Sequence, residues 1–342
     1  MTEYSLALVG FGNVGKALVR LLQHKSAALR ERYGLTFRIT GIATGHHGLA
    51  IAPDGFDLQQ VLQTSDLSTL SRAPAPGTVI DFIEHCPADV MFENSPVNHE
   101  TGQPALDHIR AALQRGMHVI TANKGPLVHG YAELMALAKE QGVHFLFEST
   151  VMDGAPIFSI FREPLPLAEL NGFTGILNSC TNLILELMDE GKSFDEAVRY
   201  AQSIGIAETD PSEDIDGWDA SVKVAALVTV LMGVPLTPQQ VDRSGIRGLT
   251  PRQLEEARAA GERWKLVCSA RREGAGVQAQ VAPQRVSPAS PLYAVQGTSS
   301  FVQFDTDVLP GLGILESNPG PETTAYGLLA DWIYATQRKG DL

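Results

Sequence analysis

An aspartate and a lysine near the middle of the chain have the types and the spacing of residues that do chemistry. Asp219 and Lys223 stand in GWDASVKVAALVTVLMG, which has a helical pattern, and residues four apart share one face of a helix. Polar residues are scarce after Lys223, and a cation in such surroundings needs an anionic partner. The alternative interpretation is an exposed ion pair, which contributes about 0.3–0.5 kcal/mol.

An ammonium group beside a carboxylate suits a reaction in which negative charge forms on an oxygen. When an aldehyde is reduced, a hydride adds to the carbon, and a nearby ammonium stabilises the charged oxygen and delivers a proton. In the reverse direction the neutral amine takes the hydroxyl proton. A second cation, Lys124, follows the strand-like HVIT, at the carboxyl edge where open α/β sheets bind ligands. The alternative is that Lys124 caps a turn.

A glycine-rich turn indicates that a dinucleotide supplies the hydride. Gly10, Gly12 and Gly15 stand between a strand pattern at 5–10 and a helix expected over about 13–32. Gly10 permits the tight turn, Gly12 lets the backbone approach a pyrophosphate, and Gly15 lets the helix pack on the strand. The N-terminus of the helix then offers free N–H groups to the phosphates.

The end of the second strand pattern bears on the choice between NADP and NAD. It reads IATGHHG, with neither Asp, Glu nor Arg at the tip, so Thr44 and Gly45 take the position near the ribose 2′-oxygen. A 2′-phosphate is not repelled there, and His46 or His47 would assist when protonated. The tip therefore favours NADP weakly. The alternative is that both histidines belong to a solvated loop.

The order of strand and helix patterns predicts an α/β fold with a doubly wound, mostly parallel Rossmann-type sheet. Strand patterns cover 5–10, 37–43, 78–83, 90–93, 118–121 and 143–148, and helical patterns cover 103–116 and 127–142. Strands separated by helices pair in parallel, and six strands fit the dinucleotide-binding layout.

The later part of the chain has a different character. Helical patterns dominate at 176–190, 193–204, 216–232 and 251–264, and strand patterns follow at 277–283 and 299–305. We therefore expect a dinucleotide-binding domain over 1–148, completed by a C-terminal helix over 321–342. An α+β catalytic and dimerisation domain is expected over 149–320.

Composition limits the class of partner. The formal net charge of −13 argues against a nucleic-acid partner, because phosphates would be repelled. The longest apolar run is too short to span a bilayer, and Glu3 stands where a signal peptide would be basic. Three cysteines without metal-ligand spacing, Cys86, Cys180 and Cys268, are expected as reduced thiols. We predict a cytoplasmic protein that acts on a small molecule.

Three further stretches, taken with the glycine turn, resemble the homoserine dehydrogenase family along nearly the whole chain. They are GMHVITANKGPL (116–127), GILNSCTNLIL (175–185) and GIAETDPSEDIDGWDASVK (205–223). The resemblance implies NAD(P)-dependent interconversion of L-homoserine and L-aspartate 4-semialdehyde, in the biosynthesis of threonine and methionine. It also implies a homodimer of the short form that lacks an ACT domain.

The resemblance assigns roles to the residues already singled out. Lys223 takes the position of the proton donor, with Asp219 beside it, and Lys124 lies near the nicotinamide and the substrate. Glu208 takes the position on the substrate amino group, and Gly205 the junction of substrate and cofactor.

The acidic stretch that precedes Asp219 has a simpler interpretation as well. Asp214 is a further candidate for substrate binding, but most carboxylates between 208 and 216 fit a solvated loop equally well. Glu208 is preferred because the ammonium of homoserine requires an anion.

Cofactor and metal positions follow from the same matching. Asn13 and Val14 fall on backbone phosphate contacts, Ser95 on a cofactor-contacting hydroxyl and Gly320 on a late cofactor contact. Family members also hold a sodium ion on carbonyl groups, which here belong to Glu148, Val151, Asp153 and Ala155.

The chain departs from the family pattern at three places. Ser179 and Cys180 replace the usual Gly and Thr of NGTTN, Met152 and Asp153 stand in the glycine-rich metal loop, and a late GPGAG segment is reduced to SNPGPE. These changes concern the sodium site and the substrate pocket.

Two other hypotheses share part of this evidence. A different two-domain NAD(P)-dependent sugar or amino-acid dehydrogenase would have the glycine turn without requiring Glu208, Asp219 and Lys223 in series. A non-catalytic nucleotide sensor is disfavoured by the presence of both Lys124 and Lys223.

Overall fold

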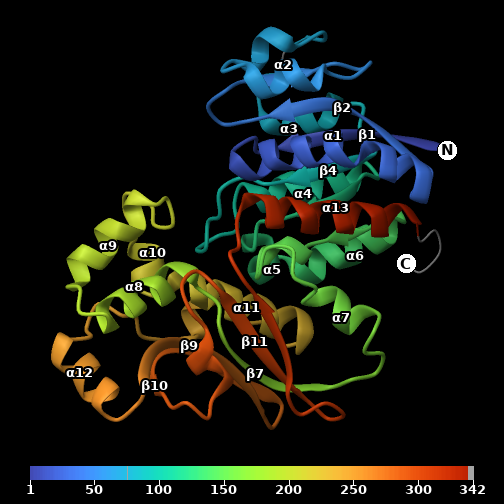
Figure 1. Ribbon diagram of the computed structural model, residues 1–342. Helices are drawn as coiled ribbons and strands as arrows, with labels where there is room; N and C mark the ends of the chain where they lie inside the picture. Colours follow the sequence, from blue (N-terminus) through green and yellow to red (C-terminus); the bar gives the residue numbers. More distant parts are fainter. Residues whose placement is uncertain (75, 338–342) are drawn as a thin grey trace. The chain divides into compact units, whose positions relative to one another are not determined.

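The computed structural model describes residues 1–74 and 76–337 and divides into two compact units (Figure 1). The first unit joins Met1–Pro156 to Gly320–Leu342, and the second is Ile157–Pro319. The first break therefore lies after Pro156, later than the break expected after Glu148. Residues 149–156 stay with the first unit because the Ser149 hydroxyl donates to the Thr324 carbonyl at 2.8 Å, and the Thr324 hydroxyl donates to the Asp153 carboxylate.

A six-stranded sheet forms the centre of the first unit, in the order β3-β2-β1-β4-β5-β6. Its strands are β1 (Thr2–Val9), β2 (Leu35–Ala43), β3 (Leu49–Ile51), β4 (Val90–Glu93), β5 (His118–Thr121) and β6 (Phe145–Leu146). Neighbours are parallel except β2 and β3, which are antiparallel. Because β1 lies between β2 and β4, the strand order reverses at β1, which is the ligand-binding point of open α/β sheets. The predicted α/β fold class is confirmed.

Residues 78–83 do not form the predicted strand. They belong to a helix, α3 (Val79–His85), which begins after Thr78 because the Thr78 hydroxyl accepts the Asp81 N–H at 3.0 Å. The apolar run of this segment suggested a buried strand, but Phe82 and Ile83 are instead the buried positions of a short helix. The sheet still has six strands, because β3, which was not predicted, is present in place of a strand at 78–83.

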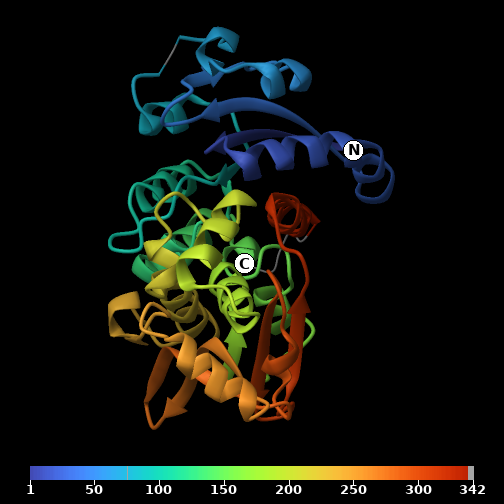
Figure 2. The ribbon, with the colours of Figure 1, turned by 60° about the vertical axis from the view of Figure 1, so that its left-hand side comes forward.

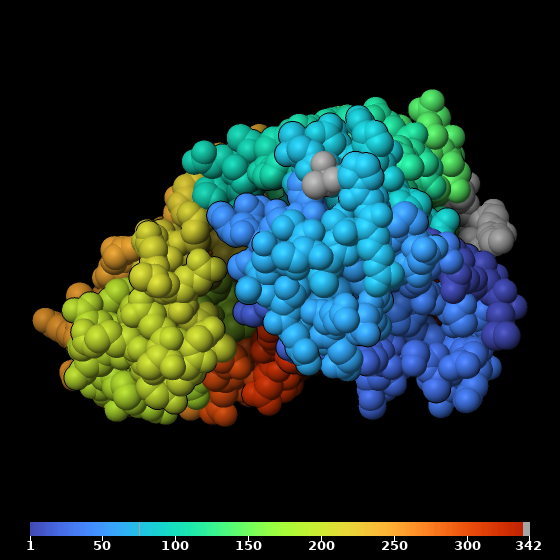
Figure 3. Space-filling model, turned by 90° about the horizontal axis from the view of Figure 1, so that it is seen from above, coloured from blue at the N-terminus to red at the C-terminus, as the bar shows by residue number. Residues whose placement is uncertain are grey.

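Further helices complete this unit, some in contact with the sheet and others packed on neighbouring helices. They are α1 (Asn13–Tyr33), α2 (Leu58–Gln63), α4 (Ala105–Gln114), α5 (Gly125–His129), α6 (Tyr131–Gln141) and α13 (Pro321–Gln337). The C-terminal helix α13 (red) packs beside α1 (blue) in Figure 1. The segment that carries β3 and α2, light blue in Figure 3, lies at the surface of the unit. Among the described residues, none of the helices is both long enough and apolar enough to cross a bilayer.

The second unit contains a mixed six-stranded sheet in the order β12-β11-β7-β9-β10-β8. Its strands are β7 (Leu170–Ile176), β8 (Asp242–Arg243), β9 (Arg263–Glu273), β10 (Gly276–Val286), β11 (Ser300–Thr306) and β12 (Leu312–Glu316). Neighbours are antiparallel except β8 and β10. This architecture confirms the prediction of a second α+β unit.

Helices accompany this second sheet, and two of them carry Asp214, Asp219 and Lys223. The helices are α7 (Phe158–Arg162), α8 (Ser179–Asp189), α9 (Phe194–Ser203), α10 (Ser212–Ile215), α11 (Trp218–Leu231) and α12 (Pro251–Ala259). Helices α8 and α11 contact β9, and α11 also contacts β10. Figure 2 shows the yellow-green to gold helices of this unit above its orange strands. The predicted helix over 251–264 is shorter than expected, because residues from Arg263 onward already belong to β9.

The first prediction concerns the C-terminal helix as part of the first core. Trp332 is fully buried, and its indole N–H has no partner among the described residues. Its ring forms T-shaped contacts with the rings of Tyr4 and Phe37, with centroids 6.2 and 6.0 Å away. Trp332→Ala should lower the free energy of unfolding by about 3–5 kcal/mol. Trp332→Phe should cost less, because it keeps a ring and removes an unsatisfied donor.

Chemical denaturation of both variants measures this difference. Tyr326→Ala is the control on the same helix, because Tyr326 is 56% exposed, and it should change the free energy of unfolding little. Equal losses in the alanine and phenylalanine variants of Trp332 would contradict the expectation.

Candidate active site

The glycine turn connects β1 to α1 at a cavity of about 650 Å³ within the first unit. Gly10 has a φ of +90°, and a Cβ at this position would lie 2.3 Å from the backbone oxygen of Asn94. Gly15 is equally restricted, since its Cβ would lie 2.8 Å from the Gly10 carbonyl. A Cβ at Gly12 would meet open space. The first and third glycines are thus required for backbone packing, and the second leaves the turn accessible to a ligand.

Residues at the carboxyl ends of β1, β2 and β4 line this cavity. Of the predicted cofactor residues, the lining includes Gly10, Gly12, Asn13, Thr44 and Ser95. Among the described residues, it does not include Val14, Gly15, Lys124 or Gly320. Gly320 lies directly before α13, where its N–H donates to the Thr323 hydroxyl at 2.9 Å.

One end of the cavity is formed by the loop after β2. The Thr44 hydroxyl accepts the His47 N–H at 2.7 Å and donates to the Gly48 carbonyl at 3.2 Å, so the loop is held by its own hydrogen bonds. His46 and His47 are exposed and line the cavity. Lys16, from the first turn of α1, is a further cation in the lining, and its place directly after Gly15 is the signal that could have predicted it.

Asn94 provides a test of whether a polar ligand fits the cavity. Both polar atoms of its side chain are buried and have no hydrogen-bond partner among the described residues, and the residue lines the cavity. An unpaired buried polar group costs about 1–3 kcal/mol, so a ligand that pairs with this amide would remove that cost. The cavity, the N-terminus of α1 and the unpaired amide together fit a dinucleotide. The sequence held no signal for Asn94 beyond its position at the end of a strand.

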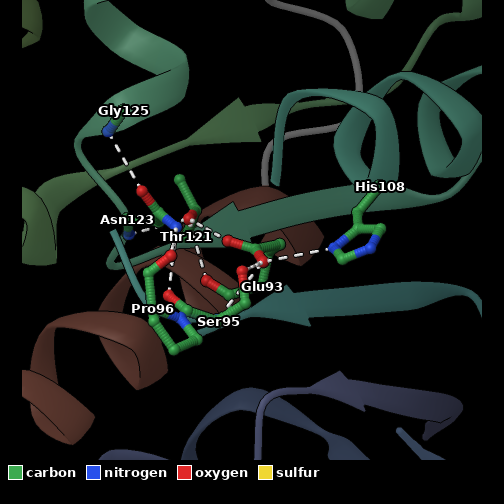
Figure 4. A network of polar contacts seen from close by, with 7 residues as sticks. All are labelled: Glu93, Ser95, Pro96, His108, Thr121, Asn123 and Gly125. Carbon is green, nitrogen blue, oxygen red and sulfur yellow. Dashed lines mark hydrogen bonds and ion pairs between the residues drawn. The ribbon is translucent and has the colours of Figure 1, made fainter. Parts of the chain in front are cut away.

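Lys124 lies three residues after the end of β5 and directly before α5. Its neighbours in the chain are fixed by hydrogen bonds, shown in Figure 4. The Asn123 side chain donates to the Ser95 carbonyl at 3.0 Å and accepts the Gly125 N–H at 3.0 Å. The turn that carries Lys124 is therefore tied to the loop that carries Ser95.

In the second unit, α11 carries the Asp219–Lys223 pair. Lys223 Nζ lies 3.1 Å from Asp219 Oδ2 and donates to the Leu177 carbonyl at 2.7 Å. The Lys223 and Asp219 side chains are only 17% and 20% exposed. This burial contradicts the alternative of an exposed surface pair, and it makes the interaction stronger than that of pairs screened by water.

Asn178 joins the carboxylates around this pair. It caps the N-terminus of α8, where its side-chain oxygen accepts the Thr181 N–H at 2.8 Å. Its side-chain nitrogen donates to Asp214 at 2.6 Å and to Asp219 at 3.0 Å. An asparagine directly before a helical run is a typical cap, but only the structure shows that it also holds two aspartates.

Burial and neighbouring charges shift the pKa values of two groups in this cluster. Burial raises the pKa of Asp214, and the negative charge of Asp219 raises it further, while the Asn178 hydrogen bond and the Lys223 charge oppose both effects. Burial likewise raises the pKa of the Cys180 thiol, and the Asp214 carboxylate adds to this. Cys180 therefore stays protonated. All three cysteines are free, and the structure adds that they are buried.

Glu208 and Gly205 lie apart from these contacts, in the loop between α9 and α10. Gly205 has a φ of +75°, and the Gln202 side chain donates to the Glu208 carbonyl at 3.1 Å. The Glu208 residue is exposed. In the part of the chain that the structure describes, no hydrogen bond or ion pair links its carboxylate to the Asp219–Lys223 pair.

The predicted sodium residues lie on the turn that follows β6. Glu148 is buried, and its N–H donates to the Asp331 carboxylate at 2.8 Å. Val151 is also buried, and the Ala155 N–H donates to the Met152 carbonyl at 2.8 Å. The Asp153 side chain is already bonded to the Thr324 hydroxyl. Among the described residues there is no cluster of three or more His, Cys, Asp or Glu suited to a metal.

The second prediction uses the raised pKa of Asp214. A carboxyl group whose pKa is raised by folding binds protons more tightly in the folded state, so it costs stability above its unfolded pKa of about 3.9. Asp214→Asn should therefore melt at a higher temperature than the wild type at about pH 7, and the difference should shrink toward about pH 4.

Thermal melts at the two pH values measure this effect. Asp210→Asn, in the loop that precedes α10, is the matched control, because the Ser212 hydroxyl and N–H lower the pKa of Asp210. The control should melt at a lower temperature than the wild type near neutral pH. A stability gain for Asp214→Asn that is independent of pH would contradict the assignment.

Comparison with known proteins assigns both units to one family. Residues 10–148 match the family model described as the NAD binding domain of homoserine dehydrogenase, and residues 156–333 match the model described as homoserine dehydrogenase. The NAD(+)-dependent homoserine dehydrogenase of Pseudomonas canavaninivorans is 36% identical over 98% of this chain and 97% of its own. The homoserine dehydrogenase of Methanocaldococcus jannaschii is 36% identical over 96% of this chain and 97% of its own.

Solved structures agree with these relatives. A hyperthermophilic archaeal homoserine dehydrogenase in complex with NADPH matches with a TM-score of 0.82 and 30% identity, over 98% of both chains. A homoserine dehydrogenase of Thiobacillus denitrificans matches with a TM-score of 0.83 and 28% identity, over 98% of this chain and 74% of its own. The chain belongs to the homoserine dehydrogenase family of NAD(P)-dependent oxidoreductases.

Proposed function

We propose that Lys223 is the proton donor when L-aspartate 4-semialdehyde is reduced to L-homoserine, and the proton acceptor in the reverse reaction. The nicotinamide cofactor supplies or accepts the hydride. The observation that supports this role is the largely buried pair of Lys223 with Asp219, 3.1 Å apart. A charged ammonium at this place stabilises the oxygen that gains negative charge and provides its proton.

The neighbours of Lys223 prepare it for this role. An ammonium group has three N–H donors, and the bonds to Asp219 and to the Leu177 carbonyl fix the position of Nζ. Asn178 in turn fixes Asp219. The amine is therefore oriented before a substrate arrives, which is how preorganised groups lower a barrier.

Other residues keep proposed roles that the family resemblance implies. Lys124 is proposed as the second amine near the nicotinamide and the substrate, and Glu208 as the anion that binds the substrate ammonium. The exposure of Glu208 supports this role, since its carboxylate is accessible to a ligand. Asp214 is proposed for substrate binding, and Gly205 for the junction of substrate and cofactor.

The third prediction tests Lys223. Lys223→Ala should lower turnover by roughly 10²–10⁴, which is the usual contribution of a general acid or base. Absorbance at about 340 nm, with homoserine and each cofactor in separate reactions, measures turnover. Lys192→Ala is the control, because Lys192 is exposed in the same unit and its Nζ lies 3.7 Å from Glu190 Oε2. The turnover of this variant should match that of the wild type.

A substrate panel separates the competing hypotheses in the same assay. Turnover with a sugar or another amino acid in preference to homoserine would favour a different dehydrogenase. Turnover by Lys223→Ala equal to that of the control would remove Lys223 from the mechanism.

We propose NADP as the preferred cofactor. The loop after β2 carries no carboxylate, and Lys16, His46 and His47 line the cavity there, so the site attracts a 2′-phosphate rather than repelling it. Named relatives use either nucleotide: one is called NAD(+)-dependent, and another was solved with NADPH. We therefore propose that local charge decides the preference.

The fourth prediction places a carboxylate in this loop. A Cβ at Gly45 meets open space within 4 Å, so a side chain fits there. Gly45→Asp should raise the apparent Michaelis constant for NADPH at least tenfold and leave that for NADH nearly unchanged, because a carboxylate repels the 2′-phosphate. Gly45→Asn is the control of equal size without the charge. Equal effects of the two substitutions on NADPH would contradict a preference for the phosphate.

We also propose a homodimer and a bound sodium ion. The strands near 277–305 are proposed as the subunit interface, and a hollow of about 370 Å³ lies on β10 and β11 of this region and on the neighbouring β7 and β9. For sodium, Glu148, Val151, Asp153 and Ala155 would supply oxygen ligands, and the buried Glu148 would supply charge. The bond of Asp153 to Thr324 leaves its carbonyl rather than its carboxylate for a metal. A cytoplasmic location stays a prediction.

A further inference from the structure

A buried carboxylate behind the cofactor cavity has no role in the reaction described above. Glu93 ends β4 and is completely buried. Its carboxylate accepts a hydrogen bond from the Ser95 hydroxyl and a second from the Ser95 N–H at 3.2 Å. The Thr121 hydroxyl shares its proton between the Glu93 main-chain carbonyl at 2.8 Å and the carboxylate at 3.3 Å. Figure 4 shows these bonds converging on the one residue.

A carboxylate in such a place is costly, and its contacts are specific. Burying a charge without compensation destabilises a fold by several kcal/mol, roughly. Neutral donors provide part of the compensation, and the His108 ring lies with Nδ1 3.5 Å from Glu93 Oε1. His108 is 5% exposed and lines the cavity. A neutral side chain would fill the same space without this cost. The charge of Glu93 therefore indicates a functional role in addition to packing.

The bonds of Glu93 connect two segments that the proposed reaction uses. One is the loop of Ser95, which lines the cofactor cavity. The other is the turn of Lys124: the Thr121 hydroxyl accepts the Asn123 N–H at 2.9 Å, and Asn123 bonds to Gly125 on the far side of Lys124.

Asn123 closes this network. Its side-chain nitrogen donates to the Ser95 carbonyl at 3.0 Å and to the Pro96 carbonyl at 3.3 Å. The Glu93 carboxylate is therefore bonded directly to the cofactor loop. Glu93 is also bonded through Thr121 to Asn123, and Asn123 is bonded to Gly125 on the other side of Lys124. A shift of one segment relative to the other would break the hydrogen bonds that join them.

We propose that Glu93 is a positioning residue that holds Ser95 and Lys124 in register with each other for the bound nicotinamide cofactor. The role of Lys124 rests on the proposed function, whereas the binding of cofactor beside Ser95 does not. Glu93 touches neither the substrate nor the reacting atoms in this proposal. It acts through the two segments that it joins, and its charge strengthens the hydrogen bonds that do so.

The fifth prediction is that Glu93→Gln disturbs both segments while keeping the fold. Glutamine has the same shape but lacks the charge, so the bonds from Ser95 and Thr121 weaken. The dissociation constant for NADPH, measured by its fluorescence without homoserine, should rise roughly tenfold, and kcat should fall roughly tenfold to a hundredfold. The fluorescence titration does not depend on turnover, so it tests Glu93 even if Lys223 has another role.

A matched variant controls for lost stability. Thr40 is fully buried in β2, and its hydroxyl donates to the Pro87 carbonyl at 2.9 Å, away from the cavity lining. Thr40→Val should lower the melting temperature without changing the NADPH dissociation constant or kcat. If Glu93→Gln behaves in the same way, Glu93 is a structural residue and the proposal is wrong.

A double variant tests the route through Ser95. If Glu93 acts on the cofactor through this residue, the combined effect of Ser95→Ala and Glu93→Gln on NADPH binding should be smaller than the product of the two separate effects. Independent, multiplicative effects on binding would overturn the proposed connection. The fall in kcat should persist in the Ser95→Ala background, because it arises through Thr121 and the turn of Lys124, and its disappearance would refute that part.

Discussion

A lysine ammonium held largely out of water must be paired, and this requirement organises the second unit. Removing one partner of a buried ion pair costs about 3–5 kcal/mol, because the other charge is left without compensation. Asp219 meets the requirement for Lys223, one helical turn away, and the Leu177 carbonyl adds a second acceptor. Asn178 then has to hold Asp219 and Asp214 together, which explains why a helix cap lies beside the candidate catalytic residues.

The same constraint acts on a negative charge in the first unit. There the buried charge is the Glu93 carboxylate, and hydroxyl and amide donors surround it. In both units, a charge that is costly to bury fixes the groups around it, because each neighbour must keep its bond. Buried charge is therefore a positioning device at both places where chemistry is expected.

The sequence predicted those parts of the fold and of the site that depend on local pattern. The glycine turn, the Asp219–Lys223 spacing and the alternation of strands and helices follow from neighbouring residues, and the structure contains all three. The prediction of a strand at 78–83 is wrong, because a short apolar run fits a strand or a helix equally well. The cap that Thr78 provides favours the helix.

Residues whose roles arise only from tertiary contacts gave no such signal. Asn178 and His108 are ordinary polar residues in the sequence, and their significance lies in partners far along the chain. Asn94 is significant for the opposite reason, since its buried amide has no partner in the described part of the chain. The distinction is physical: spacing determines what shares a helix face, whereas burial determines which polar groups must find a partner.

Cofactor choice shows how function varies on a fold that stays constant. The glycine turn is restricted by backbone contacts at Gly10 and Gly15, so it cannot change without loss of packing. The loop after β2 is exposed at Gly45, where a side chain meets open space. A change of charge there costs the core nothing, because no buried contact depends on it. Relatives of this architecture are named with different nucleotides, and Gly45 is a position where the charge of this chain can change without disturbing its packing.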